Sequence, residues 1–338
     1  MRQRIYFVYA LLSLAILPLT VSAQVQHRNL TQENRQLREE NDSLRRLLSE
    51  YEEAYASTWD ALVNMDWEKD YDDVFGASDV LNSSDREHTD FMHIVQAAAP
   101  QVASSWHRSI DEQVAVYLGK RKRYLPAIIG RYEYYFPIFK TIFGKYDIPD
   151  ELISLCIVES AVTTTAVSRA GAAGMWQLMP ATARRYGLRV DELVDERFDV
   201  YKSTEVAAHF LRDVHKGLGR WDLTVLSYNC GAGRVRQAII QSGGSGLIWD
   251  TAACLPAETR RYLPSFLAVR YVISEADAFG IQPLRRTYPK VKVILVDTPI
   301  SKEEFCKNNK CSLSLFRECN PHVLTERIPE GVSVYVPF

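Results

Sequence analysis

Apolar side chains recur at three- and four-residue steps through most of the middle of this chain, the period that lines one face of an α-helix. Glycine and proline residues separate the periodic stretches. The pattern predicts helices at 108–120, 123–145, 150–160, 178–187, 203–216, 221–229, 232–241 and 259–279. We therefore expect a mainly α protein with an all-helical domain over residues 93–286.

The pattern changes after Pro289. Two β-branched runs, 291–296 and 332–336, flank two short helical stretches at 301–309 and 312–319. This order predicts a small βααβ module over residues 287–338.

The first residues have the features of an export signal. Two arginines precede an apolar run over 5–19, and the tripeptide Val21-Ser22-Ala23 follows as a cleavage site. We predict a signal peptide over 1–23, with a membrane anchor as the alternative, although the run is short for one. The first cysteine of the chain is Cys156, so no thiol at the cleavage site could carry a lipid. The exported protein is expected to keep no stable membrane anchor.

Residues 24–62 repeat every seven positions. One series is Leu30, Leu37, Leu44 and Tyr51, and a second falls at the other seam position of a heptad. The repeat predicts a coiled coil that joins two chains as a parallel homodimer through residues 27–62. A single solvated helix is the alternative.

Charge is nearly balanced over the whole chain, with a formal net charge of −2. Without a basic surface field, neither nucleic acid nor an anionic membrane is an expected partner. Acidic residues gather in 63–92, where no helical or strand period persists, and this composition predicts a flexible linker.

The six cysteines follow no zinc-binding pattern, so no metal site is expected. Cys306, Cys311 and Cys319 lie close together in the sequence, and a disulfide among them is expected in an oxidising compartment, with the pairing left open. Cys156 lies in an apolar helical stripe and is expected to be a buried small side chain rather than a reactive thiol.

One acidic side chain interrupts the apolar face of the helix expected at 150–160. Leu152, Leu155 and Cys156 share that face, and Glu159 follows at the same spacing. Burial disfavours a charged carboxyl and raises its pKa, and a carboxyl protonated near neutral pH is what general-acid cleavage of a glycosidic bond requires. Glu159 is therefore the candidate catalytic residue. The alternative is a buried glutamate satisfied by backbone groups or by an arginine.

A set of motifs follows this helix, at Ala166–Pro180, Tyr186–Leu188, Asp195–Arg197, Ser227–Val235 and Leu255–Pro264. In this order and spacing they resemble the lytic transglycosylases of the goose-lysozyme-like (SLT) family, and most of all the membrane-bound murein transglycosylase D type. The resemblance covers residues 123–279 and implies a lysozyme-like all-helical catalytic domain.

The resemblance also implies roles for individual residues. Glu159 matches the catalytic acid/base, and no metal or organic cofactor is implied. Trp176 and Tyr186 are expected in the core rather than as stacking platforms, and Asn229 has helix capping as its alternative role. The positions expected to bind or order the substrate are Ser168, Met175, Gln177, Tyr228, Asn229 and Glu258.

The implied substrate is the glycan strand of peptidoglycan, which places the protein in the periplasm or cell-wall compartment of a bacterial envelope. Glu159 would protonate the oxygen between N-acetylmuramic acid and N-acetylglucosamine, and would then accept the proton of the muramoyl C6 hydroxyl as a 1,6-anhydro ring closes. Two alternatives are a goose-type lysozyme, in which water attacks, and a non-catalytic wall-binding scaffold. Whether the enzyme cleaves at the ends of glycan strands (exo) or within them (endo) stays open.

The C-terminal module resembles a degenerate LysM domain through Asp297-Thr298, Asn320-Pro321 and the segment 328–337. The resemblance implies that the module holds glycan. The alternative is that it packs on the catalytic domain as an appendage.

Overall fold

The computed structural model describes residues 35, 39, 107–244 and 246–338. The signal peptide, coiled coil and linker expected at 1–92 therefore lie outside the described residues, except for residues 35 and 39, which are helical and exposed. Within the described part, no helix combines the length and the apolar character needed to cross a membrane.

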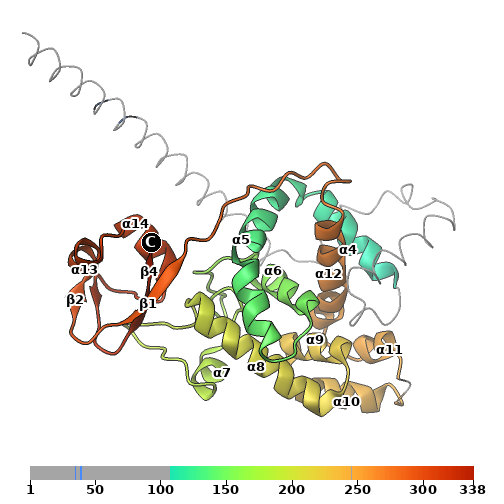
Figure 1. Cartoon of the computed structure of the whole chain (residues 1–338). Helices are drawn as coiled ribbons and strands as arrows, with labels where there is room; N and C mark the ends of the chain where they lie inside the picture. Colours follow the sequence, from blue (N-terminus) through green and yellow to red (C-terminus); the bar gives the residue numbers. More distant parts are fainter. Residues whose placement is uncertain (1–34, 36–38, 40–106, 245) are drawn as a thin grey trace, which may run out of the picture. The chain divides into compact units, whose positions relative to one another are not determined.

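The described part is mainly helical up to residue 274, as the periodicity predicts (Figure 1). The prediction missed one short helix, α11, which has only six residues. The α-helices are α4 (Arg108–Leu118), α5 (Leu125–Gly144), α6 (Leu155–Ser160), α7 (Pro180–Arg185), α8 (Val200–Leu218), α9 (Trp221–Cys230), α10 (Ala232–Gln241), α11 (Ile248–Ala253) and α12 (Ala257–Ser274). Two 3₁₀ helices, η1 (Lys122–Tyr124) and η2 (Asp150–Ser154), precede α5 and α6.

Helix α8 shows how local sequence defines these elements. It begins where the side chain of Asp199 accepts hydrogen bonds from the first backbone N–H groups, and it ends at Gly219 with φ of 70°. Its apolar face packs against α5 and α9. Helix α12 packs against α4, α6 and α9. The fully buried aromatic side chains of this domain include Trp176, Phe139, Phe143 and Phe266.

The segment after α12 runs back past α5 before the chain enters the C-terminal module (Figure 1). The N–H of Leu284 donates to the carbonyl of Pro126 at 2.9 Å. A Cβ on Gly130 would lie 2.2 Å from the carbonyl oxygen of Leu284, so only glycine allows this close approach to α5.

The C-terminal module has the expected βααβ order. Strand β1 (Val291–Leu295) pairs antiparallel with β4 (Ser333–Pro337), and α13 (Lys302–Asn309) and α14 (Leu313–Cys319) lie between them in sequence. Two further strands of two residues each, β2 (Ile300–Ser301) and β3 (Arg327–Ile328), also pair antiparallel. The buried core of the module includes Phe305, Phe316 and Val334.

All six cysteines are described, and all are free thiols. The expected disulfide among the C-terminal three is therefore not formed in this structure. Burial raises the pKa of the Cys306 thiol to about 12, and a hydrogen-bonding contact with the Cys311 thiol adds to the increase. Cys156 is 0% exposed, which confirms it as a core side chain.

Candidate active site

Glu159 is the last residue but one of α6, a short helix that continues directly from η2. The helix ends there because Ala161 and Val162 adopt left-handed backbone conformations, with φ of 50° and 62°. Such conformations cost about 1 kcal/mol or more each for residues other than glycine, so surrounding contacts must hold them. The guanidinium of Arg131 on α5 provides one such contact by donating to the carbonyl of Ala161 at 3.2 and 3.0 Å.

The carboxyl of Glu159 is half-buried and accepts a hydrogen bond from the hydroxyl of Tyr262 on α12. This partner is neither a backbone group nor an arginine, the two partners considered for a merely structural glutamate. Burial raises the pKa of Glu159 from its ordinary 4.5 to about 8, against the lowering effect of the Tyr262 hydrogen bond, and the negative charge of Glu258 adds to the increase. The carboxyl is therefore protonated at neutral pH and can act as an acid.

Glu258, in the first turn of α12, lies close enough to the Glu159 carboxyl for its charge to act on it. The amide of Asn229 on α9 donates to Glu258 at 3.5 Å, and its oxygen accepts from the hydroxyl of Thr259 at 2.7 Å. Asn229 therefore links α9 to α12 through its side chain, and it does not cap a helix.

Tyr228 also approaches the glutamate site from α9. Its hydroxyl donates to the backbone carbonyl of Trp176 at 2.8 Å. Burial and the nearby charge of Glu159 raise the pKa of Tyr228, so the phenol stays protonated and neutral.

The loop that follows α6 carries the remaining predicted site residues. The hydroxyl of Ser160 donates to the carbonyl of Met175 at 2.9 Å, which ties this loop to the residue next to Glu159. The side chain of Met175, expected to bind substrate, is 1% exposed and packs in the core. Gln177 has φ of 44°, and its amide donates to the carbonyls of Ala166 and Gly174 at 3.2 and 2.8 Å within the loop.

Ser168 lies nearer the start of the same loop. Its hydroxyl accepts from the N–H of Ala172 at 3.0 Å, so in this structure it closes a turn. Trp176 is fully buried against Phe139 and Phe143, as expected for a core residue. Tyr186 is half-buried and donates to Asp213 at 3.0 Å.

The structure therefore brings Tyr228 and Glu258 close to Glu159, with Asn229 bonded to Glu258. It gives Ser168, Met175 and Gln177 contacts within their own loop. The sequence reasoning missed Tyr262, which is the direct partner of Glu159. Its spacing four residues after Glu258 places both on one face of α12, and this is the signal that could have identified it.

Among the residues that the structure describes, no group of His, Cys, Asp or Glu side chains is arranged to hold a metal ion.

The helical domain has a candidate site built around one half-buried, protonated glutamate. This arrangement defines the class of enzymes that act by general-acid catalysis. In comparison with known proteins, residues 138–247 match the family model of the transglycosylase SLT domain. The matched residues lie within the helical domain of residues 107–286, for which we use the name SLT domain.

Two curated relatives are similar in sequence to part of this chain. The membrane-bound lytic murein transglycosylase D of Escherichia coli (strain K12) is 38% identical over 175 residues, which cover 51% of this chain and 38% of that protein. A putative tributyltin chloride resistance protein of Alteromonas sp. (strain M-1) is 36% identical over 111 residues, which cover 32% of this chain and 54% of that protein. The chain therefore matches about half or less of the length of these relatives.

Among solved structures, the 70 kDa soluble lytic transglycosylase of Escherichia coli is similar over 44% of this chain and 25% of that chain, with 21% identity and a TM-score of 0.35.

Proposed function

We propose that this protein is a peptidoglycan lytic transglycosylase with Glu159 as its acid and then its base. The observation that supports this proposal best is the state of the carboxyl: its pKa is raised to about 8 and its one described donor is the hydroxyl of Tyr262. A protonated carboxyl near neutral pH supplies the proton that a glycosidic oxygen needs when its bond breaks.

The reaction has two proton transfers. Glu159 first donates to the oxygen between N-acetylmuramic acid and N-acetylglucosamine, while positive charge develops at the muramoyl C1. The ionised carboxylate then takes the proton of the C6 hydroxyl, whose oxygen closes onto C1 as a 1,6-anhydro ring. Tyr262 favours the ionised form through its hydrogen bond, so it stabilises the carboxylate between the two transfers.

The residues around Glu159 would serve the substrate. Tyr228 and the pair Asn229–Glu258 present polar groups near the carboxyl, and Ser168 and Gln177 would contact the saccharide from the loop. We assign Met175 a supporting role, because its carbonyl holds Ser160 and its side chain is buried.

A hydrolase of the goose-lysozyme type is the second candidate, and Glu258 is the observation that favours it. Its charge contributes to the raised pKa of Glu159, so the two carboxyls lie near one another. A carboxylate in such a position can activate a water molecule for attack on the sugar.

We further infer that the protein is exported to the bacterial envelope through residues 1–23 and dimerises through residues 27–62. Its partner there is the glycan of peptidoglycan. The buried contacts of the C-terminal module with the SLT domain support packing on that domain, rather than glycan binding, as the role of the module.

Digestion of purified peptidoglycan by the full chain tests the reaction. Muropeptides are analysed by mass spectrometry before and after borohydride reduction. Products that borohydride does not reduce and that are one water lighter than hydrolytic products identify a transglycosylase. Reducible ends identify a hydrolase, and intact peptidoglycan would refute both.

Two substitutions separate the roles of the carboxyls. Glu159→Gln is expected to abolish cleavage in either mechanism, because the amide cannot donate a proton to the leaving oxygen. Glu258→Gln is expected to leave 1,6-anhydro products in place if the C6 hydroxyl attacks, whereas it would abolish a hydrolysis that uses Glu258 as the base. Full activity of Glu159→Gln would contradict the proposal.

A further inference from the structure

The C-terminal module is joined to the SLT domain by backbone pairing. Val194 and Val323 form an antiparallel bridge, the N–H of Asp195 donates to the carbonyl of His322 at 2.9 Å, and the N–H of Leu324 donates to the carbonyl of Leu193 at 3.0 Å. Val194 is 0% exposed and belongs to the hydrophobic core of the module, although it lies between α7 and α8 in the sequence. The module core is therefore incomplete without a residue of the SLT domain.

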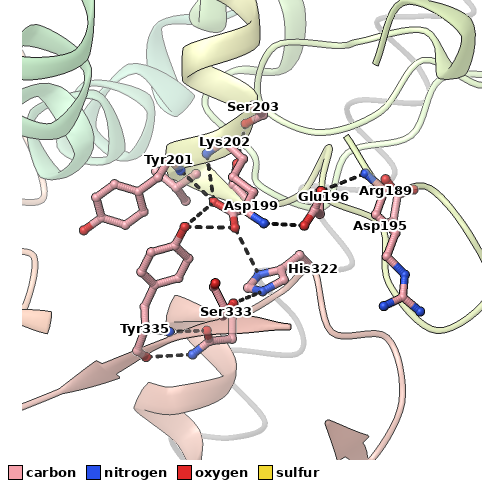
Figure 2. A network of polar contacts seen from close by, with 12 residues as sticks. Arg189, Asp195, Glu196, Asp199, Tyr201, Lys202, Ser203, His322, Ser333 and Tyr335 are labelled. Atoms are coloured by element: carbon pink, nitrogen blue, oxygen red, sulfur yellow. Dashed lines mark hydrogen bonds and ion pairs between the residues drawn. The ribbon is translucent and has the colours of Figure 1, made fainter. Parts of the chain in front are cut away.

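A buried carboxylate joins the two parts a few residues later (Figure 2). Asp199, which caps α8, is 0% exposed and accepts from the hydroxyl of Tyr335 on β4 at 2.9 and 3.0 Å. The ring of Tyr335 stacks on Tyr201 with centroids 4.4 Å apart. His322 lies on the other side, with Nδ1 3.9 Å from the same carboxylate and Nε2 3.1 Å from the carbonyl of Ser333. The Nδ1 distance is too long for a hydrogen bond, so the donors to the Asp199 carboxyl are the hydroxyl of Tyr335 and the backbone N–H groups of Tyr201 and Lys202. A buried carboxyl needs such donors, because losing one costs about 1–3 kcal/mol or more.

The segment held in this way also carries Arg197, whose guanidinium reaches the loop after α6. Arg197 makes a two-point ion pair with Asp195 at 2.9 and 2.7 Å, and both side chains are less than 10% exposed. Its Nη1 donates to the carbonyl of Gly171 at 2.7 Å and to that of Leu178 at 3.2 Å. On the backbone side, a Cβ on Gly174 would lie 1.9 Å from the carbonyl oxygen of Arg197. The loop is thus fitted against residues 195–199.

The same loop also contacts residues of the glutamate site. The carbonyl of Met175 accepts from Ser160, the residue that follows Glu159, and the carbonyl of Trp176 accepts from Tyr228. A continuous set of contacts therefore runs from β4 of the module through residues 194–199 and the loop 166–178 to the residues beside Glu159.

We propose that the C-terminal module is part of the catalytic unit, and that Tyr335 and His322 are positioning residues that hold the loop 166–178 in its substrate-binding form through Asp199 and Arg197. The role of the loop in binding rests on the proposed function, whereas the ordering of the loop by the module does not. Neither residue touches the reacting atoms, so their effect passes through the segment 194–199.

The substitution Tyr335→Phe in the full chain removes the hydroxyl and keeps the ring that stacks on Tyr201. Hydrogen–deuterium exchange is expected to show about tenfold faster exchange of amides in 168–178, because the segment that fixes the loop loses a buried hydrogen bond. Amides of α12 are expected to keep their rates. If the protein cleaves peptidoglycan, kcat/KM for glycan should fall about tenfold, mostly through a higher KM.

Glu318→Gln is the matched control. Glu318 on α14 joins the module to the rest of the chain by other contacts, accepting from Tyr134 at 2.7 Å and pairing with Arg286 at 3.1 Å. Neither contact involves Asp199, Arg197 or a residue of the loop. This variant is expected to leave exchange in 168–178 and activity unchanged. His322→Gln, as a second variant, should speed exchange in the same amides as Tyr335→Phe.

Two results would overturn the proposal. One is unchanged exchange in 168–178 when Tyr335→Phe is folded, and the other is an equal increase in that loop for Glu318→Gln. Because the exchange measurement needs no catalysis, absence of glycan cleavage would refute the proposed function and leave this test intact.

Discussion

The raised pKa of Glu159 should be visible in the stability of the fold. The ordinary pKa of the carboxyl is 4.5, and burial raises it to about 8 in the folded protein. Between these pH values the folded state keeps a proton that the unfolded chain has released, so stability falls as pH rises. The contribution of this bound proton to the free energy of unfolding is fully present below about pH 4.5, and it is completely lost above about pH 8.

The size of the effect follows from the same two values. One pKa unit corresponds to about 1.4 kcal/mol, so the difference between 4.5 and about 8 sets an upper limit of about 5 kcal/mol. Because the side chain of Glu159 is only half-buried, water screens part of this, and we expect about 2–3 kcal/mol. Glu159→Gln removes the titration, while its amide oxygen can still accept the hydrogen bond of Tyr262.

Urea unfolding of the wild-type protein and Glu159→Gln from about pH 4 to pH 9 measures this difference. The free energy of unfolding of the variant relative to the wild type should rise by about 2–3 kcal/mol across this range. The contributions of all other titrating groups to the pH dependence are the same in both proteins and cancel in the difference. A difference that stays constant with pH would refute the raised pKa, and a wild-type protein that gains relative stability as pH rises would reverse its sign.

Three further substitutions test Tyr262 beside the catalytic carboxyl, the loop after α6 and the core of the C-terminal module. Tyr262→Phe removes the hydrogen bond that lowers the pKa of Glu159, so the alkaline limb of the pH–activity profile should move up by about one pH unit, with kcat at least about tenfold lower. Gly174→Ala places a methyl group 1.9 Å from the carbonyl oxygen of Arg197 at φ of 79°, and should lower the free energy of unfolding by about 3 kcal/mol or more. Val194→Ala removes a fully buried side chain from the core of the C-terminal module, and should cost about 2 kcal/mol in urea unfolding.

Each has a control or a contradicting result. For Gly174→Ala the control is Gly187→Ala, where φ is 90° but no atom lies within 4 Å of the added Cβ, so only backbone strain of about 1–2 kcal/mol is expected. An alkaline limb that does not move in Tyr262→Phe would show that the tyrosine has no effect on the carboxyl. A loss below about 0.5 kcal/mol in Val194→Ala would show that this side chain is not part of a packed core.

The helices could be predicted because their information is local. The apolar period of α8 and the breakers Gly217 and Gly219 at its end are present in the sequence itself, and the β-branched runs marked β1 and β4. Helix α11 was missed because six residues are too few to show a period. Glu159 was found because it interrupts a local apolar face.

The rest depends on contacts between residues far apart in the sequence. Tyr262 lies 103 residues after Glu159, and no local pattern pairs the two. The motif Asp195-Glu196-Arg197 was recognised, but its ion pair with the neighbouring loop follows only from the three-dimensional structure. Likewise, the burial of Met175 depends on packing that the loop sequence alone does not specify.

The bond between Tyr335 and Asp199, separated by 136 residues, has a consequence for the order in which the chain acquires its structure. The SLT domain precedes β4 in the sequence, so it emerges first during synthesis or export, and domains usually fold as they emerge. Here the cap of α8 and the core around Val194 are completed only when the last strand arrives. Residues 194–199 and the loop they support therefore reach their final form only after Tyr335 has emerged and bonded to Asp199, so the candidate site is completed later than the helices around it.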